Sequence, residues 1–178
     1  MIVNKAYRYR IYPTTEQKLM FAKTFGCVRF IYNKMLSDRI DYYKETGQKL
    51  NNTPAQYKEE FPWLKEVDSL ALANAQMNLN KAYGHFWNDS QHFGKPRFKS
   101  KKNRRASYST NNQKGSVRIE GHKVKLPKVG WVKLCQHRPL PENSIIKTVT
   151  ISQTPSGKYY ISMLVEYENQ ILPVIPKT

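Results

Sequence analysis

The chain has 178 residues, of which 39% are hydrophobic, and this is enough for a folded core and excludes a disordered basic tail. Lys and Arg outnumber Asp and Glu by 30 to 13, which gives a formal net charge of +17. This excess favours a polyanionic partner, and nucleic acid phosphates are the usual one. A basic protein for anionic membranes is the alternative, but no strongly amphipathic Lys-rich helix supports it.

The sequence predicts a cytoplasmic protein with no membrane partner and no structural metal. Lys5 and Arg8 interrupt any early apolar stretch, and no stretch reaches bilayer length. Cys27 and Cys135 are far apart and outside any Cys-x-x-Cys pair, and the four histidines lack ligand spacing. We therefore expect two free thiols and no zinc site in this chain.

The first predicted element is a half-buried strand over residues 2–12. Its apolar side chains alternate with Arg8 and Arg10, so we expect the arginines to point outward. Thr14 and Gln17 have the three-residue spacing of a capping box, which predicts that a helix begins there.

Helical periodicity then continues to a stop at Gly47, and Gly26 predicts a break between a short first helix and a longer second one. Residues 48–67 indicate a loop with one short helix after Pro54. A third helix begins near Asp68. One of its faces carries a stripe of amides and basic groups, made by Asn74, Asn78, Lys81 and His85. Such a stripe suits a DNA groove, although an ordinary solvated face gives the same pattern.

A basic segment follows the third helix. Seven of the eleven residues from Lys95 to Arg105 are Lys or Arg, and no carboxylate lies between Asp89 and Glu120. Like charges at this density repel one another unless a polyanion neutralises them. The segment is therefore predicted to contact a phosphate backbone, with counterion release as the main source of binding free energy.

After Phe93 the hydrophobic period changes from 3.6 to two and predicts about five antiparallel strands. With the strand at 2–12 the sheet has six, enough to curl into a small barrel. We predict an α+β fold, in which residues 1–13 and 94–170 form a β-barrel domain. Residues 14–93 form an inserted helical domain, and residues 171–178 form a linker.

Several ordered motifs resemble one family. They are Lys5-Ala6-Tyr7 with Arg10-Ile11-Tyr12-Pro13 and Gln17, Gly26-Cys27-Val28-Arg29-Phe30-Ile31-Tyr32-Asn33, Pro62-Trp63-Leu64, Pro96-Arg97-Phe98-Lys99-Ser100-Lys101-Lys102 and Lys125-Leu126-Pro127-Lys128-Val129-Gly130-Trp131-Val132-Lys133. Together they cover essentially all of the chain and resemble the amino-terminal half of the TnpB (OrfB) proteins of bacterial transposons. The resemblance implies an OB-like wedge barrel with an inserted helical recognition lobe. It also implies guide RNA from the transposon end and double-stranded target DNA as partners.

The resemblance also implies where the chemistry lies. The nuclease part of the family is a RuvC-like domain that uses Mg²⁺, with a Zn²⁺-binding insertion, and it would follow the linker at residues 171–178. We therefore expect no catalytic residue and no cofactor in this chain.

Three groups of site residues are predicted. The backbone-binding residues are Arg8, Arg10, Lys95, Arg97, Lys99, Lys101, Lys102, Arg104 and Arg105. The residues that stack on bases or support the cations are Tyr7, Tyr9, Phe98 and Tyr108. By the resemblance, the motif beside the DNA target is read by Asn52, Gln56, Ser69, Leu70, Ala73, Thr110 and Asn111.

Other functions are compatible with parts of the pattern. A guide-dependent binder without cleavage would act as a transcriptional repressor. A stand-alone enzyme is poorly supported, because the sequence shows no nucleophile–base pair and no phosphate-cradling glycine loop. The break predicted at Gly26 superficially permits a helix-turn-helix DNA-binding protein, but the second helix is too apolar along its length to lie in a groove.

Overall fold

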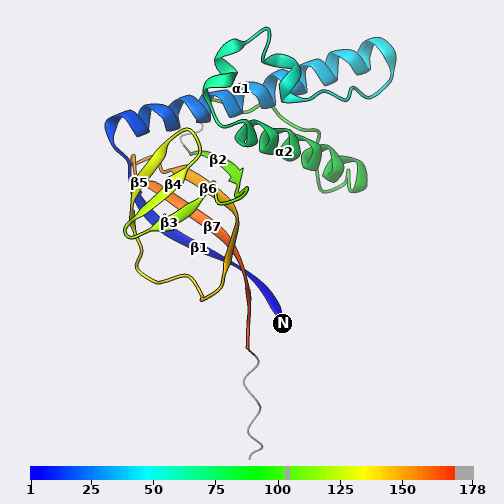
Figure 1. Cartoon of the computed structure of the whole chain (residues 1–178). Coiled ribbons are helices and arrows are strands. Elements are labelled where there is room, and N and C mark those ends of the chain that lie inside the picture. Colours follow the sequence, from blue (N-terminus) through cyan, green and yellow to red (C-terminus); the bar gives the residue numbers. More distant parts are fainter. Residues whose placement is uncertain (103–104, 171–178) are drawn as a thin grey trace, which may run out of the picture.

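The computed structural model describes residues 1–102 and 105–170 and has two layers, a helical layer above a curled sheet (Figure 1). The helical elements are α1 (Thr15–Thr46), the 3₁₀ helices η1 (Pro54–Tyr57) and η2 (Pro62–Glu66), and α2 (Ser69–Asn88). The strands are β1 (Ile2–Tyr12), β2 (Ala106–Asn111), β3 (Arg118–Glu120), β4 (Lys123–Leu126), β5 (Gly130–Cys135), β6 (Ile145–Gln153) and β7 (Tyr159–Glu168). None of the helices in the described ranges is long and apolar enough to cross a membrane.

The strands form one antiparallel sheet in the order β2-β6-β7-β1-β5-β4-β3. β1 returns to the middle of the sheet, where it pairs with β7 on one side and β5 on the other, as the strand–helix–strand order predicted. The α+β class is therefore confirmed. Among the described residues β2 and β3 are edge strands that do not pair with each other, so the sheet is a half-barrel and not a closed barrel.

The first strand of the second half, β2, was not predicted. Its outward side chains are Ser107, Ser109 and Asn111, and its buried ones are Tyr108 and Thr110. A strand with so few apolar residues gives almost no alternating signal, and its assignment depends on the ladder with β6.

The predicted break at Gly26 is wrong, because α1 runs without interruption from Thr15 to Thr46. A glycine inside a helix costs about 1 kcal/mol relative to alanine. Phe25, Cys27 and Val28 are buried on either side of it, and their burial outweighs that cost. The two predicted ends are confirmed. Thr14 and Gln17 form the capping box, and Gly47 ends the helix with a φ of +69°.

The helical layer is joined to the sheet by aromatic packing. Phe21 of α1 lies 5.6 Å from Tyr159 of β7 between ring centroids, and Phe25 lies 5.6 Å from Tyr108 of β2. All four rings are buried. Gln17 adds a polar link, because its amide donates to the Trp131 carbonyl at 2.7 Å. These contacts hold α1 across one end of the sheet.

Candidate nucleic-acid interface

Strand register places twelve side chains on the outward face of β2, β6, β7 and β1, which we call the polar sheet face. They form three rows, namely Asn111, Thr148, Leu164 and Ala6; Ser109, Thr150, Ser162 and Arg8; and Ser107, Ser152, Tyr160 and Arg10. None of the twelve is buried, and none is a carboxylate. These hydroxyls, amides and arginines can donate hydrogen bonds to a polyanion. The next row along the same face contains Glu166 of β7 beside Asn4 of β1, and Glu166 pairs with Lys147 at 3.0 Å.

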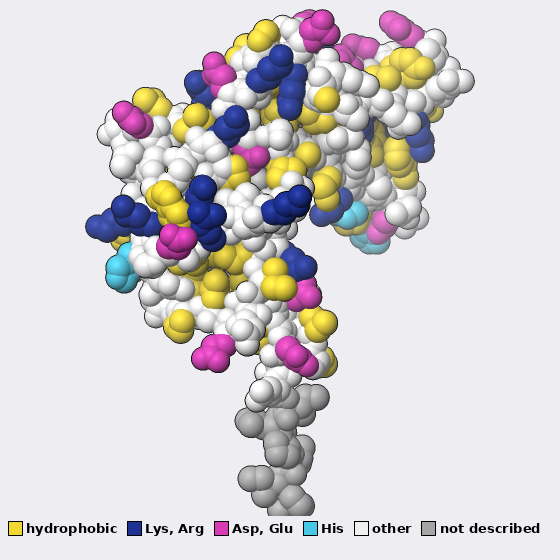
Figure 2. All heavy atoms as spheres, viewed as in Figure 1, with side chains coloured by type: hydrophobic (Ala, Val, Ile, Leu, Met, Phe, Trp, Pro, Cys, Tyr) yellow, Lys and Arg dark blue, Asp and Glu magenta, His cyan; other side chains and the backbone are white. Residues whose placement is uncertain are grey.

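The helix α2 faces part of this surface across a hollow of about 360 Å³. We call it the α2 hollow; its walls are Asn74, Met77, Asn78 and Lys81 on the helix and Ala6, Ser109, Asn111, Thr148, Thr150, Ser162 and Leu164 on the sheet. Figure 2 shows the molecule hollowed below the helical layer, with Lys and Arg side chains on both layers of this face.

Three of the four residues of the predicted amide stripe therefore line the α2 hollow. Asn74 donates to the Asn111 side-chain oxygen at 2.7 Å and to the Leu70 carbonyl at 2.8 Å, so it bridges helix and sheet. Asn78 and Lys81 are exposed. His85 lies elsewhere and packs on Phe93, with 4.8 Å between ring centroids.

Arg8 and Arg10 are held at the other end of the polar sheet face by tyrosine rings. The Arg8 guanidinium lies 4.1 Å from the Tyr160 ring centroid, and the Arg10 guanidinium lies between Tyr12 at 4.9 Å and Tyr160 at 5.8 Å. Within the described ranges neither arginine pairs with a carboxylate, and the buried Nε of Arg10 has no hydrogen-bond partner. Stacking fixes the guanidinium planes and leaves their N–H groups, other than the buried Nε of Arg10, available to an anion. Sequence reasoning missed Tyr160, which only the β1–β7 register brings to these arginines.

The basic segment is attached to α1 by one asparagine. The Asn33 amide donates to the Lys99 carbonyl at 2.9 Å, and its oxygen accepts from the Lys99 backbone N–H at 2.7 Å. The Lys99 ammonium lies 4.4 Å from the ring centroid of Tyr32, and partial burial there lowers the pKa of Lys99. The exposed segment thus has a defined backbone position beside α1 although residues 94–100 have no regular secondary structure.

The remaining cations of this segment differ in whether the structure describes them. Lys95, Arg97, Lys101, Lys102 and Arg105 are exposed. Arg104 lies outside the described residues.

The four predicted aromatic residues divide into three buried rings and one exposed ring. Tyr7 lies under the Arg138 guanidinium at 4.3 Å, and the Tyr9 hydroxyl donates to the Arg138 carbonyl at 2.8 Å. Tyr108 belongs to the joint with α1, where burial, with a smaller contribution from Asp68, raises its pKa. Phe98 is 56% exposed, so among these four it has a ring surface open to a base.

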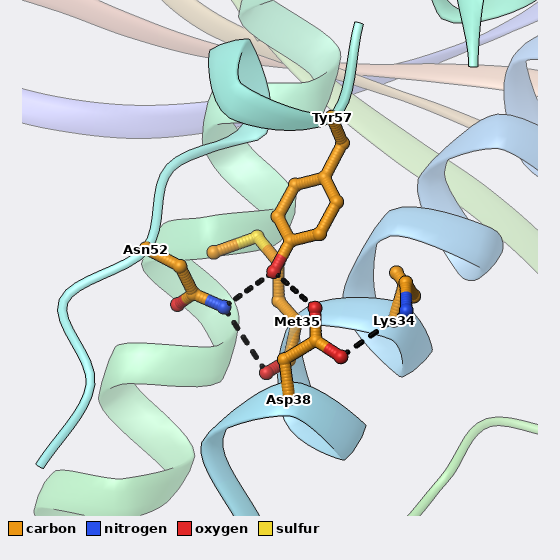
Figure 3. Close-up of polar contacts among 5 residues, drawn as sticks. All are labelled: Lys34, Met35, Asp38, Asn52 and Tyr57. Atoms are coloured by element: carbon orange, nitrogen blue, oxygen red, sulfur yellow. Dashed lines mark hydrogen bonds and ion pairs between the residues drawn. The ribbon is translucent and has the colours of Figure 1, made fainter. Parts of the chain in front are cut away.

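Asn52 is buried inside the helical layer (Figure 3). Its amide nitrogen donates to the Tyr57 hydroxyl at 2.8 Å and to the Met35 carbonyl at 3.2 Å, and its oxygen accepts from Arg39 at 2.7 Å. The Tyr57 hydroxyl donates in turn to Asp38 at 2.7 Å. These internal bonds occupy the side chain that the family resemblance assigned to motif reading.

The other predicted motif-reading residues lie on η1, at the start of α2 and on β2. Gln56 and Ser69 are exposed, and Leu70 and Ala73 are half-buried on the first turns of α2. Thr110 is buried, and its hydroxyl donates to the carboxylate of Asp68.

Asp68 also caps α2, because its other carboxylate oxygen accepts from the Leu70 N–H at 3.0 Å. Of the motif-reading residues, only Asn111 lines the α2 hollow.

Metal ligands do not converge in the part of the chain that the structure describes, where no three His, Cys, Asp or Glu side chains gather. The described residues therefore offer no ligand cluster for the Mg²⁺ or Zn²⁺ that the family resemblance assigns to the nuclease domain.

Comparison with known proteins shows which family the chain is similar to. Residues 1–48 match the helix-turn-helix domain model of the OrfB proteins of IS605 elements, although the structure has one strand and one continuous helix there. A "Putative RNA-guided DNA endonuclease" of Streptomyces pristinaespiralis is 32% identical over 171 residues, covering 92% of this chain and 42% of the relative. The "Putative RNA-guided DNA endonuclease InsQ" of Escherichia coli (strain K12) is 27% identical over 173 residues, covering 92% and 41%.

A third relative, the "Virulence protein VsdF" of Salmonella dublin, is 33% identical over 113 residues, covering 54% of this chain and 93% of that protein. The chain spans about two fifths of the length of the two endonuclease relatives, which it matches along almost all of its own length. The chain therefore belongs to the transposon-associated OrfB (TnpB) family.

Proposed function

We propose that this chain is the part of a TnpB-like RNA-guided endonuclease that binds the guide RNA scaffold and recognises double-stranded target DNA. The guide RNA comes from the transposon end, and the protein works in the cytoplasm. The observation that carries the proposal is the polar sheet face, which meets the amide stripe of α2 across the α2 hollow. The likeness to two relatives named as RNA-guided endonucleases supports it.

The cations are proposed to bind the sugar–phosphate backbone. Arg8 and Arg10 are oriented by tyrosine rings and lack acidic partners among the described residues, as a backbone clamp requires. The basic segment contributes Lys95, Arg97, Lys99, Lys101, Lys102, Arg104 and Arg105. Its attachment to Asn33 reduces the conformational entropy that the segment loses on binding.

The α2 hollow is proposed to recognise the duplex beside the target. Asn78 carries an exposed amide, which pairs with adenine edges, and Lys81 carries an exposed ammonium, which pairs with guanine edges. Asn111 lines the hollow beside them, where its amide is held by Asn74 and Thr148. These side chains come from both layers, so a duplex lying over the mouth of the hollow contacts the helix and the sheet together. Ser69, Leu70 and Ala73 extend this reading surface along the start of α2, and Gln56 of η1 is proposed to add to it.

The buried members of the predicted site are proposed to position the others. Tyr7, Tyr9 and Tyr108 support the cationic strands from within the core, and Thr110 holds β2 against α2 through Asp68. We propose residues 1–13 and 94–170 as one domain and residues 14–93 as its helical insertion. The catalytic carboxylates, with Mg²⁺ and Zn²⁺, are proposed to lie outside residues 1–178.

The test is to purify the chain and sequence the nucleic acid bound to it. We expect a structured RNA from a transposon end. Recovery of random DNA alone, or of no nucleic acid, would overturn the proposal.

Asn78→Ala and Lys81→Ala then test the α2 hollow in guide-directed binding to a library of target flanks. Each is expected to relax discrimination at one position by about 1–3 kcal/mol. The control Asn51→Ala changes an exposed asparagine outside the hollow. Unchanged flank preference in both hollow variants would contradict this assignment.

A further inference from the structure

Four side chains form a continuous stack at the far end of the helical layer, which we call the aromatic ladder. The rings of Tyr83 and Trp87 on α2 are stacked, with 5.2 Å between centroids and 30° between planes. The Arg39 guanidinium lies 5.8 Å from the Tyr83 centroid, and the Lys49 ammonium lies 3.6 Å from the Trp87 centroid. The order is therefore Arg39, Tyr83, Trp87, Lys49.

One end of the aromatic ladder is anchored. Arg39 donates to the Asn52 side-chain oxygen at 2.7 Å and to the Asn80 side-chain oxygen at 2.8 Å. Asn52 is itself fixed by Met35 and Tyr57. The buried asparagine therefore holds the Arg39 guanidinium that lies beside the Tyr83 ring.

The other end is open. Trp87 is 53% exposed, and Lys49 lies on an exposed loop just after α1. Within the described ranges Lys49 has no carboxylate partner, so only the indole ring holds its ammonium. Figure 2 shows exposed hydrophobic side chains beside Lys and Arg on this layer. An ammonium on a long flexible side chain is displaced from a ring at small cost.

We propose that the aromatic ladder is a stacking site for an unpaired base of the bound RNA. The base lies on the exposed surface of Trp87, and the displaced Lys49 ammonium bonds to the adjacent phosphate. This inference rests on the proposed function, because it assumes that the chain binds RNA. A neighbouring cation and a π surface together are what single-stranded nucleic acid binds.

An unpaired RNA base fits better than a paired one. Bases inside a duplex are covered on both faces by their neighbours, whereas loops, bulges and ends of folded RNA present free faces to aromatic side chains. The net charge of +17 favours this polyanion over an apolar protein partner.

Tryptophan fluorescence of the full chain tests the contact directly. The probe is a defined RNA hairpin with an unpaired loop, and a blunt RNA duplex and a single-stranded DNA of equal length are the comparison arms. We expect the hairpin to quench emission, and Trp87→Phe to lose that quenching although Trp63 and Trp131 remain. Quenching that is as large with the blunt duplex, or that persists in Trp87→Phe, would overturn the inference. Quenching by single-stranded DNA alone would assign the site to DNA and overturn the choice of RNA.

Affinity gives the second measurement. Trp87→Ala is expected to weaken hairpin binding about 5- to 150-fold, the effect of losing one stacked base. The control is Tyr43→Ala, which removes a 61% exposed ring outside the aromatic ladder. Equal losses in both variants would reject the ladder as the site.

Circular dichroism of each variant is the control for folding. Absence of RNA binding by the wild-type chain would contradict the proposed function. Normal RNA binding by the wild type that is unchanged in the Trp87 variants would contradict only the stacking site.

Discussion

Asn33→Ala separates preorganisation of the basic segment from its charge. The substitution removes both hydrogen bonds to the Lys99 backbone, of 2.9 and 2.7 Å, and leaves every cation in place. Each bond contributes about 0.5–1.5 kcal/mol net. Because the segment is exposed, we take the lower part of the summed range, about 1–2 kcal/mol, which corresponds to a 5- to 30-fold loss of RNA affinity.

The assay is fluorescence anisotropy of a labelled RNA hairpin at several KCl concentrations. The slope of log K against log [salt] counts the neutralised phosphates, so Asn33→Ala is expected to lower affinity with an unchanged slope. Lys99→Ala with Lys101→Ala and Lys102→Ala is expected to flatten the slope by about 0.7–0.9 per lost contact. Asn51→Ala serves as the control, because this asparagine is exposed.

Two results would refute this reasoning. Wild-type affinity in Asn33→Ala would mean that the attachment to α1 does not organise the segment for RNA. A flattened slope in Asn33→Ala would mean that the attachment changes how many cations reach phosphates, and not merely the entropy of ordering them.

Two further predictions concern stability. Thr110→Val removes the hydroxyl that donates to the buried Asp68 and is expected to lower the free energy of unfolding by about 1–3 kcal/mol. Urea denaturation measures this, with the half-buried Ser109→Ala as the control, and equal stability of the two variants would contradict a role for Thr110 in the joint. Burial, followed by the hydrogen bond to Asp38, raises the pKa of Tyr57 to about 12, so its neutral form stabilises the fold below pH 10 and this contribution is lost as the pH rises toward 12. Tyr57→Phe should therefore lose less stability than wild type between pH 9 and 11.5 in the same measurement, and an identical pH dependence would refute the assignment.

Local chemistry made several features predictable. The capping box of Thr14 and Gln17, the end at Gly47 and the alternation along β1 depend on residues a few positions apart. The ordered motifs from Lys5 to Lys133 also predicted the family. The charge of the basic segment predicted the class of partner, because net charge is a property of composition.

Features that depend on distant residues were not predictable. Gly26 looked like a break because helix propensity is local, whereas the burial that keeps α1 continuous comes from packing with other elements. Asn33 and Lys99 are 66 positions apart and meet only in the fold. Asn52 matched a motif-reading position by resemblance, and its burial against Tyr57 appears only in the tertiary structure.

A basic α+β protein of the OrfB family, with a first strand that pairs with the later ones, was predictable from local patterns and motifs. Which side chains share a surface depends on how distant segments pack. Register placed Ser109, Thr150, Ser162 and Arg8 in one row, and helix packing aligned Arg39 with Tyr83. The physical reason is range: capping and periodicity act over one or two turns, whereas register and packing are set by contacts between segments far apart in the chain.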